Sequence, residues 1–208
     1  MRAGPVLPIY VVCDHSFSML DHIDTVTDSL LELHRTCGLD PLVAERTRFC
    51  LIGFSESPEI LLPLGGPDGL ATISGGVTRA ASNFGPAFSF LRETITRDVA
   101  VLRRNSHEVC RPVVFFLSDG QPTDPLAWPA AHARLVDPAW ADHPDIVGFG
   151  VGEADPVTIN RICTSGAYLG RNGADLGAAL MHLLSISGPS VPSRLSTAGR
   201  TEATMEIH

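Results

Sequence analysis

The sequence predicts an α/β protein with a mostly parallel central sheet and helices on both faces. Two observations support this fold class. Short apolar runs alternate along the chain with segments of helical periodicity, and such alternation implies crossover connections between parallel strands. The runs are also apolar nearly throughout, as expected of strands that are buried on both faces.

The opening of the chain predicts the first strand and the first helix. Residues 7–13 (LPIYVVC) form a β-branched apolar run, typical of a buried strand. Over 20–37 the period changes, and these apolar residues recur at helical spacing: Ile23, Val26, Leu30 and Leu33. Asp21 and Asp24 lie in the first turns, where they suit the positive end of the helix dipole, and Gly38 is expected to end the helix.

The next segment predicts two strands, an irregular stretch and a second helix. Residues 47–55 (TRFCLIGFS) predict a strand, and 59–64 (EILLPL) predict a short edge strand because Pro63 cannot donate a ladder hydrogen bond. Five glycines and two prolines in 63–81 argue against regular structure there. A second amphipathic helix is predicted from these residues: Phe84, Phe88, Leu91, Ile95 and Leu102.

The second half of the chain continues the alternation. Residues 112–120 (PVVFFLSDG) form the clearest buried strand of the sequence. The remaining predicted elements are a helix within 126–141, a strand at 145–152, a short helix near 156–163, a weak strand at 166–170 and a helix near 174–186. We expect one domain over 1–187 and a flexible or docking tail over 188–208, where periodicity is lost.

Composition argues against several classes of protein. The net charge of −8 disfavours non-specific binding to nucleic acid or anionic lipid. Five cysteines without a C-x-x-C spacing disfavour a disulfide framework or a zinc knuckle. The N-terminal apolar stretch is too short for a signal peptide, and no apolar segment approaches the ~20 residues that span a membrane. We therefore expect a reduced, soluble, cytoplasmic protein.

Oxygen-bearing side chains follow the predicted strands. Asp14, Ser16 and Ser18 (in DHSFS) follow the first strand, Asp119 follows the clearest strand, and Ser82 precedes the second helix. Because functional crevices lie beyond the carboxyl ends of parallel strands, we expect these side chains to converge. Hydroxyls and carboxylates without His or Cys suit a hard cation, Mg²⁺ first. With only two carboxylates among its ligands, the metal would remain electron-poor. It would therefore accept the carboxylate of an Asp or Glu from a partner protein.

The segments DHSFS and LSDGQPTD, together with Ser82, resemble the metal-ion-dependent adhesion site (MIDAS) of von Willebrand factor type A (vWA) domains. LSDGQPTD also resembles the bacterial tellurite-resistance-associated (TerY-like) members. The resemblance covers about 7–187 and implies a three-layer Rossmann-like vWA fold with one antiparallel edge strand. It further implies a non-enzymatic, Mg²⁺-dependent interaction module, with Mn²⁺ or Ca²⁺ as other metals, in a bacterial stress-response or signalling system encoded with kinases and phosphatases.

The resemblance implies these metal ligands, residue by residue: Asp14, Ser16, Ser18, Ser82 and Asp119. The two serines after Asp14 would bind through their hydroxyls, and the two aspartates directly or through water. Ser82 stands where the family has Thr, with Thr78 as the alternative if the loop alignment shifts. The helix near 174–186 would shift between two positions when a partner's carboxylate completes the metal shell.

Phe17 departs from the family pattern, because members commonly have Gly between the two serines. Two explanations are open. Either Phe17, together with His15, forms an apolar rim that a partner covers, or Phe17 folds back onto its own helix.

Other interpretations of these segments remain. A helix-capping turn explains the DHSFS segment without a metal, and Asp124 fits a turn or cap. An aspartate-nucleophile phosphotransferase also has Asp after its first strand, but typically with a second carboxylate two residues on and a lysine in the site. A structural scaffold with an unused metal site is a third class. GFGVG (148–152) lacks the spacing of a dinucleotide motif, and close backbone approach at a strand end explains it better.

Overall fold

The computed structural model describes residues 4–39, 41–72 and 81–170. The strands are β1 (Leu7–Asp14), β2 (Thr47–Phe54), β3 (Pro58–Gly65), β4 (Val113–Ser118), β5 (Asp145–Val151) and β6 (Gly166–Gly170). The α-helices are α1 (Ile23–Leu39), α2 (Pro41–Arg46), α3 (Phe84–Arg104), α4 (Trp128–Leu135) and α5 (Pro156–Ile162), and two 3₁₀ helices are η1 (Phe17–His22) and η2 (Pro67–Thr72). The predicted helix near 174–186, the tail and Thr78 lie outside the described residues.

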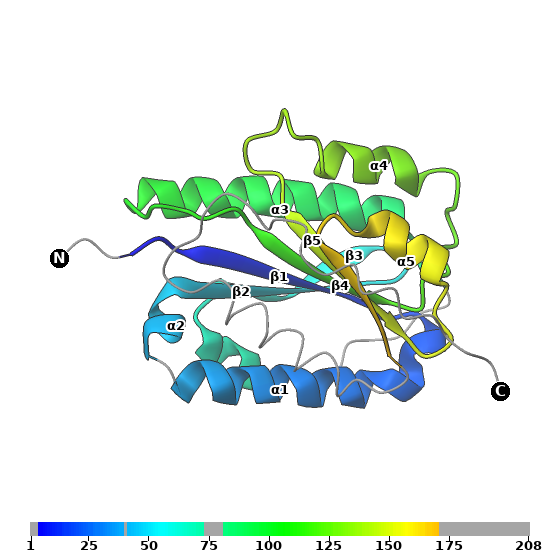
Figure 1. Cartoon of the computed structure of the whole chain (residues 1–208), viewed down its shortest axis with the longest axis horizontal. Coiled ribbons are helices and arrows are strands. Elements are labelled where there is room, and N and C mark those ends of the chain that lie inside the picture. Colours follow the sequence, from blue (N-terminus) through cyan, green and yellow to red (C-terminus); the bar gives the residue numbers. More distant parts are fainter. Residues whose placement is uncertain (1–3, 40, 73–80, 171–208) are drawn as a thin grey trace.

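The six strands form one sheet in the order β3-β2-β1-β4-β5-β6. Every neighbouring pair is parallel except β2 and β3, which are antiparallel. The central strand β1 is in register with both neighbours, so that Val11 pairs with Leu51 on one side and Phe115 on the other. The carboxyl ends of β1, β4 and β5 therefore lie together at one end of the sheet, next to η1 and α5 (Figure 1). The predicted fold class is confirmed.

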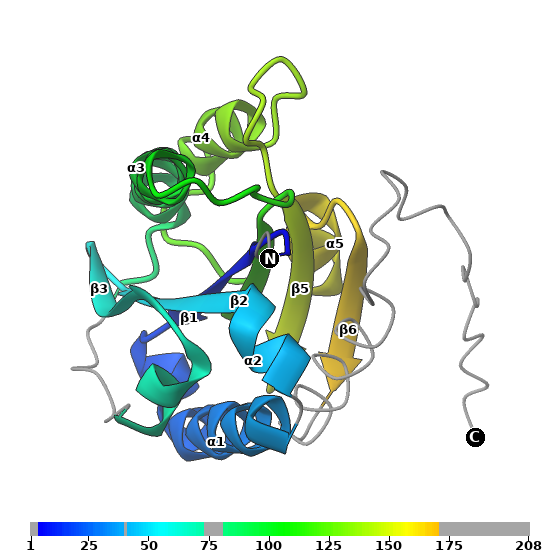
Figure 2. The same cartoon turned by 90° about the vertical axis from the view of Figure 1, so that its left-hand side faces the viewer.

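Successive residues of the strands supply two separate hydrophobic cores, one on each face of the sheet. On one face, α3, α4 and α5 pack over β-strand residues such as Tyr10 and Phe116. On the other, α1 and η2 cover the alternate residues, including Val11 and Phe115. Figure 2 shows the resulting layers, with α3 and α4 on one side of the sheet and α1 on the other. This double burial explains why the strand sequences are apolar throughout.

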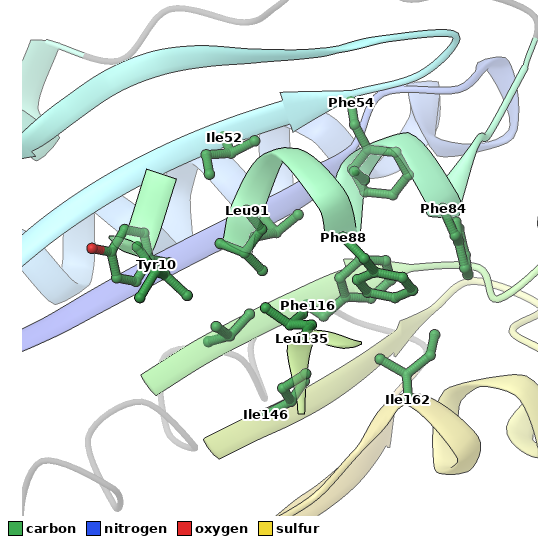
Figure 3. Close-up of a cluster of buried hydrophobic side chains, with 14 of the residues drawn as sticks. Tyr10, Ile52, Phe54, Phe84, Phe88, Leu91, Phe116, Leu135, Ile146 and Ile162 are labelled. Carbon is green, nitrogen blue, oxygen red and sulfur yellow. The ribbon is translucent and has the colours of Figure 1, made fainter. Parts of the chain in front are cut away.

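An aromatic cluster fills the first core at the end where the strands finish. Phe84 of α3 packs edge-to-face on Phe54 and on Phe116, with ring centroids 5.6 and 5.1 Å apart. Phe88 lies beside Phe116 (Figure 3), and its ring also contacts that of Trp128 at the start of α4. Because Phe54, Phe84 and Phe116 each lie within three residues of a polar loop, the cluster fixes the relative positions of three loops.

Three local features differ from the sequence predictions. The short helix α2 was not predicted. The stretch 63–81 was expected to lack regular structure, which is wrong for the end of β3 and for η2, where Pro67 starts a 3₁₀ turn and Leu70 is fully buried. Finally, α1 continues through Gly38 to Leu39, since a glycine ends a helix only when the chain turns away there.

The edge strand β3 is irregular. Its pairing with β2 shifts register twice, between Phe49 and Leu51 and between Leu51 and Ile52. It also carries prolines at Pro58 and Pro63, neither of which has an N–H to donate. The predicted edge position is therefore confirmed.

The glycine-rich segment GFGVG forms the end of β5, where α5 approaches the backbone closely. A Cβ added at Gly148 would lie 2.5 Å from the Cys163 sulfur and 3.0 Å from a methyl carbon of Ile159. Glycine is thus required for packing, as predicted. No helix in the described part of the chain has the length and apolar character needed to cross a membrane.

Candidate metal centre

The carboxylate of Asp14, at the carboxyl end of β1, is only 1% exposed and joins three segments. Its Oδ1 accepts a hydrogen bond from the backbone N–H of Ser16, at 2.9 Å. Its Oδ2 accepts from the hydroxyl of Ser82, at 2.6 Å, and from the hydroxyl of Ser118, at 2.7 Å. These donors come from the loop after β1, the segment before α3 and the end of β4. Three segments far apart in sequence therefore meet at one buried carboxylate.

The hydroxyls of Ser16 and Ser18 lie side by side, with their oxygens 3.0 Å apart. Ser16 is buried and Ser18 is exposed, so the pair leads from the Asp14 carboxylate toward solvent. The turn of η1 holds them, because the Met19 N–H donates to the Ser16 carbonyl at 3.0 Å and the Met19 side chain is 1% exposed. The two hydroxyl oxygens therefore lie next to each other close to the Asp14 carboxylate, one on a buried residue and one on an exposed residue.

The segment that carries Ser82 is held from both sides. On one side, the Asn83 N–H donates to the Ser55 carbonyl at the end of β2, at 2.8 Å. On the other, Ser82 and Thr123 are joined twice: the Thr123 N–H donates to the Ser82 carbonyl at 2.8 Å, and the Ser82 N–H donates to Thr123 Oγ1 at 3.2 Å. Ser82 is 3% exposed. Its hydroxyl is therefore fixed by neighbouring loops more than by its own segment.

Asp124 caps α3 from a position forty residues along the chain. Its Oδ1 accepts from the Phe84 N–H at 2.9 Å and its Oδ2 from the Gly85 N–H at 2.7 Å. The residue at the usual N-cap position, Asn83, makes no side-chain capping bond. The prediction that Asp124 is a cap is confirmed, and with Thr123 it ties the loop after β4 to the segment of Ser82.

Asp119 follows β4 and is 6% exposed. Its Oδ1 accepts from the Gln121 N–H at 3.0 Å, and its carbonyl accepts from the Asp155 N–H at 2.8 Å. Between them, Gly120 adopts a left-handed conformation (φ 73°), with the Asp155 carbonyl 2.9 Å from where a Cβ would lie. Within the described residues, no hydrogen bond joins the Asp119 carboxylate to the hydroxyls around Asp14.

Ser118 is the residue of this cluster that the sequence analysis missed. It is completely buried, donates to Asp14, and accepts from the Gly120 N–H at 3.0 Å. Its position at the end of an apolar strand, directly before Asp119, is the signal that could have identified it. A polar residue buried at a strand end requires a partner, and the neighbouring strand supplies Asp14.

The family model described as "von Willebrand factor type A domain" matches residues 9–179. The chain belongs to the vWA family. No curated protein matches it. The matching family model covers every residue of the Asp14 cluster.

Solved structures share this fold at low sequence identity. The pilus adhesin SpaC from Lactobacillus rhamnosus GG, in an open conformation, has a TM-score of 0.68 and 12% identity, over 89% of this chain and 30% of that one. Proximal thread matrix protein 1 from the mussel byssus, with a zinc-occupied MIDAS motif, has a TM-score of 0.61 and 16% identity, over 88% of this chain and 48% of that one. The ArnB paralog VWA2 from Sulfolobus acidocaldarius has a TM-score of 0.55 and 18% identity, over 86% of this chain and 45% of that one. The chain spans about half or less of the length of these proteins.

In this vWA domain the two predicted rim residues are placed differently. Phe17 is 56% exposed, which agrees with an outward-facing side chain. His15 is only 8% exposed and packs with its ring near Gly53 of β2, so it does not contribute to an exposed rim. The reason is that the His15 N–H continues the sheet by donating to the Phe54 carbonyl at 2.8 Å.

Burial sets the electrostatics of the site. It raises the pKa of the Asp14 carboxyl above its usual value, while the hydrogen bonds from Ser82, Ser118 and Ser16 act in the opposite direction. Burial lowers the pKa of His15, so its ring tends to be neutral and supplies no counter-charge to Asp14. Among the described residues no cationic side chain forms an ion pair with Asp14, and a buried carboxylate of this kind is a favourable position for a metal ion.

The available donors are all oxygens. Hydroxyls of three serines and carboxylates of two aspartates suit a hard divalent cation that retains water ligands. Among the residues the structure describes, no three His, Cys, Asp or Glu side chains gather as a metal cluster. This donor set therefore fits Mg²⁺ better than a closed structural zinc site.

Proposed function

We propose that this vWA domain is a metal-dependent protein-interaction module that captures an acidic side chain of a partner. The proposed metal ligands are Asp14, Ser16, Ser18, Ser82 and Asp119. The observation that carries the proposal is the convergence of two remote hydroxyls on the buried carboxylate of Asp14, beside the paired hydroxyls of DHSFS. Mg²⁺ is the proposed resident metal, with Mn²⁺ and Ca²⁺ as alternatives.

In this proposal the side chains of the protein hold the metal ligands in position, and the metal supplies the positive charge that binds the partner's carboxylate. Asp14 holds the Ser82 hydroxyl in place, and neutral hydroxyl ligands leave most of the metal's positive charge uncompensated. A carboxylate from a partner protein would then be the strongest available additional ligand. Asp119 would contribute through an intervening water or directly, since its carboxylate is bonded only within its own loop among the described residues.

Apolar side chains surround this end of the sheet and support a protein as the ligand. The loop after β1 exposes Phe17 (56%) and Leu20 (50%). The loop after β4 exposes Leu126 (95%), and the start of α5, after β5, exposes Val157 (66%). Since all three segments follow carboxyl strand ends, we propose that these four residues form the apolar rim that a partner covers.

The two other classes have less support. A phosphotransferase would need a second carboxylate near Asp14, where this chain has Ser16, and the chain contains no lysine. A scaffold with an unused site would have no need to keep hydroxyl and carboxylate donors together. The finer assignment to a TerY-like bacterial stress-response or signalling system, working with kinases and phosphatases, rests on the segment LSDGQPTD, and the cytoplasmic location rests on the cysteine pattern and the short N-terminal apolar stretch.

Calorimetric titration of chelator-treated protein with MgCl₂ tests the metal site. We expect saturable binding that Asp14→Ala abolishes and Ser82→Ala weakens. Ser89→Ala is the matched control, because this hydroxyl donates to the Gly85 carbonyl within α3 and should leave binding unchanged. Equal binding by wild type and Asp14→Ala would refute the metal site. Partner capture from lysate with Mg²⁺ and with chelator, using the same variants, then tests the interaction itself.

A further inference from the structure

A cavity lies between α3 and α4, away from the loops around Asp14. Its volume is about 510 Å³, within the range of small-molecule sites. The side chains that matter below are Arg92, Glu93, Thr96, Arg97 and Arg134. Arg92 lies eight residues after the start of α3, about 12 Å along the helix axis. Figure 2 shows α3 and α4 side by side on the same face of the sheet.

Arg92 is held in position but lacks a partner for part of its guanidinium group. The guanidinium carbon lies 4.4 Å from the centre of the Trp140 ring, a cation–π distance. Its Nε is buried and has no hydrogen-bond acceptor among the residues that the structure describes. Leaving a buried donor without an acceptor is energetically unfavourable, and more so when the group is charged. A ligand oxygen that reached this N–H would remove that penalty.

The lining of the cavity is positively charged in an acidic protein. Arg92, Arg97 and Arg134 outnumber the single acid, Glu93, so the formal charge of the lining is +2, whereas the chain carries −8. Arg97 uses its Nε to pair with Asp98 at 3.1 Å, which leaves its terminal nitrogens free to donate elsewhere. Arg134 is exposed and makes no ion pair within the described residues. An anion in the cavity would meet three guanidinium groups.

The type of anion follows from charge and shape. Guanidinium groups present paired donors that match the oxygens of phosphate, and a lining of +2 matches a phosphate dianion better than a carboxylate. Thr96 donates its hydroxyl to the Arg92 carbonyl at 2.8 Å, so the arginines supply the donors. The cavity is larger than one phosphate group needs, and Ala131 adds apolar surface to its lining. We propose that this cavity binds a small organic phosphate monoester.

Titration with phenyl phosphate, followed by ¹⁵N NMR of metal-free protein, tests the proposal. We expect saturable shifts at the amides of Ser89, Thr96 and Ala131, and no such shifts with benzoate or with NaCl at equal ionic strength. Arg92→Gln and Arg134→Gln should each weaken binding at least tenfold. Arg104→Gln is the matched control: it removes the same charge from the same helix outside the cavity, and should change the Kd less than twofold.

Arg134→Gln decides the outcome if Arg92→Gln unfolds the protein, because the exposed side chain of Arg134 can be replaced without breaking an internal contact. Shifts that never saturate, or that NaCl reproduces, would mean screening of surface charge and would overturn the proposal. Equal affinities of Arg134→Gln and Arg104→Gln would overturn it as well. Because the titration is made without metal, failure of the proposed function leaves this test unaffected.

Discussion

Replacing Asp124 by alanine tests the idea that a remote carboxylate organises the metal centre. The substitution removes both hydrogen bonds to the first amides of α3, at 2.9 and 2.7 Å, and a negative charge next to the positive end of a 21-residue helix. Loss of a capping side chain costs about 0.5–2 kcal/mol, and the charge–dipole interaction adds about 0.3–1 kcal/mol. Since Asn83 makes no side-chain capping bond, we expect the free energy of unfolding to fall by about 1–3 kcal/mol, the sum of the two contributions.

Urea denaturation of chelator-treated protein measures this change. Asp124→Asn keeps one acceptor oxygen and should lose about half as much. Asp137→Ala is the control, because this exposed carboxylate only accepts from the nearby Ala139 N–H and should change stability by less than about 0.5 kcal/mol. Mg²⁺ affinity should also fall in Asp124→Ala, since Thr123 and Ser82 are then held less firmly. If Asp124→Ala and Asp137→Ala have equal stability, the carboxylate does not organise this loop.

Three further predictions concern the site. Asp14→Asn should abolish Mg²⁺ binding and yet stabilise the metal-free protein near neutral pH. The reason is that the Nδ2 of the new asparagine can donate to the hydroxyls of Ser82 and Ser118. A melting temperature below that of the wild type would contradict this prediction. Since the pKa of Asp14 is raised by burial, its contribution to stability is present below the unfolded-state pKa and is lost as pH rises through the folded-state pKa. The affinity for Mg²⁺ should therefore fall, as the pH is lowered, at a higher pH than that at which an ordinary aspartate protonates. Calorimetry that shows constant affinity down to about pH 4 would disprove this prediction. Gly120→Ala should lower the free energy of unfolding, measured by urea denaturation, by about 1–2 kcal/mol, because φ is 73° and the added Cβ would lie only 2.9 Å from the Asp155 carbonyl oxygen; wild-type stability would rule out this constraint.

Periodicity and strand-end positions were enough to predict the sheet and the loops that meet beside it. The apolar runs of β1, β2, β4 and β5 are continuous because these strands are buried on both faces, and Pro63 marked the edge strand β3 correctly. Asp14, Ser16 and Ser82 converge because parallel strands end together. These predictions depended only on local pattern and on a general property of parallel sheets.

Contacts between distant residues could not be predicted in this way. Ser118 and Asp14 are 104 positions apart, and Asp124 is 40 positions from the amide of Phe84 that it caps. Nothing in the local sequence indicates that a cap comes from another loop. His15 was misplaced for a related reason, since its burial depends on the register of β1 against β2 and on the absence of a side chain at Gly53.

The prolines and register shifts of β3 have a consequence for self-association. An extended neighbouring chain could add to this border only by matching an unbroken row of backbone donors and acceptors. Pro58 and Pro63 interrupt that row, and the shifted pairing with β2 bends it. Growth of a fibril or a continuous intermolecular sheet from this border is therefore blocked at the level of the backbone, whatever side chains a neighbouring molecule brings.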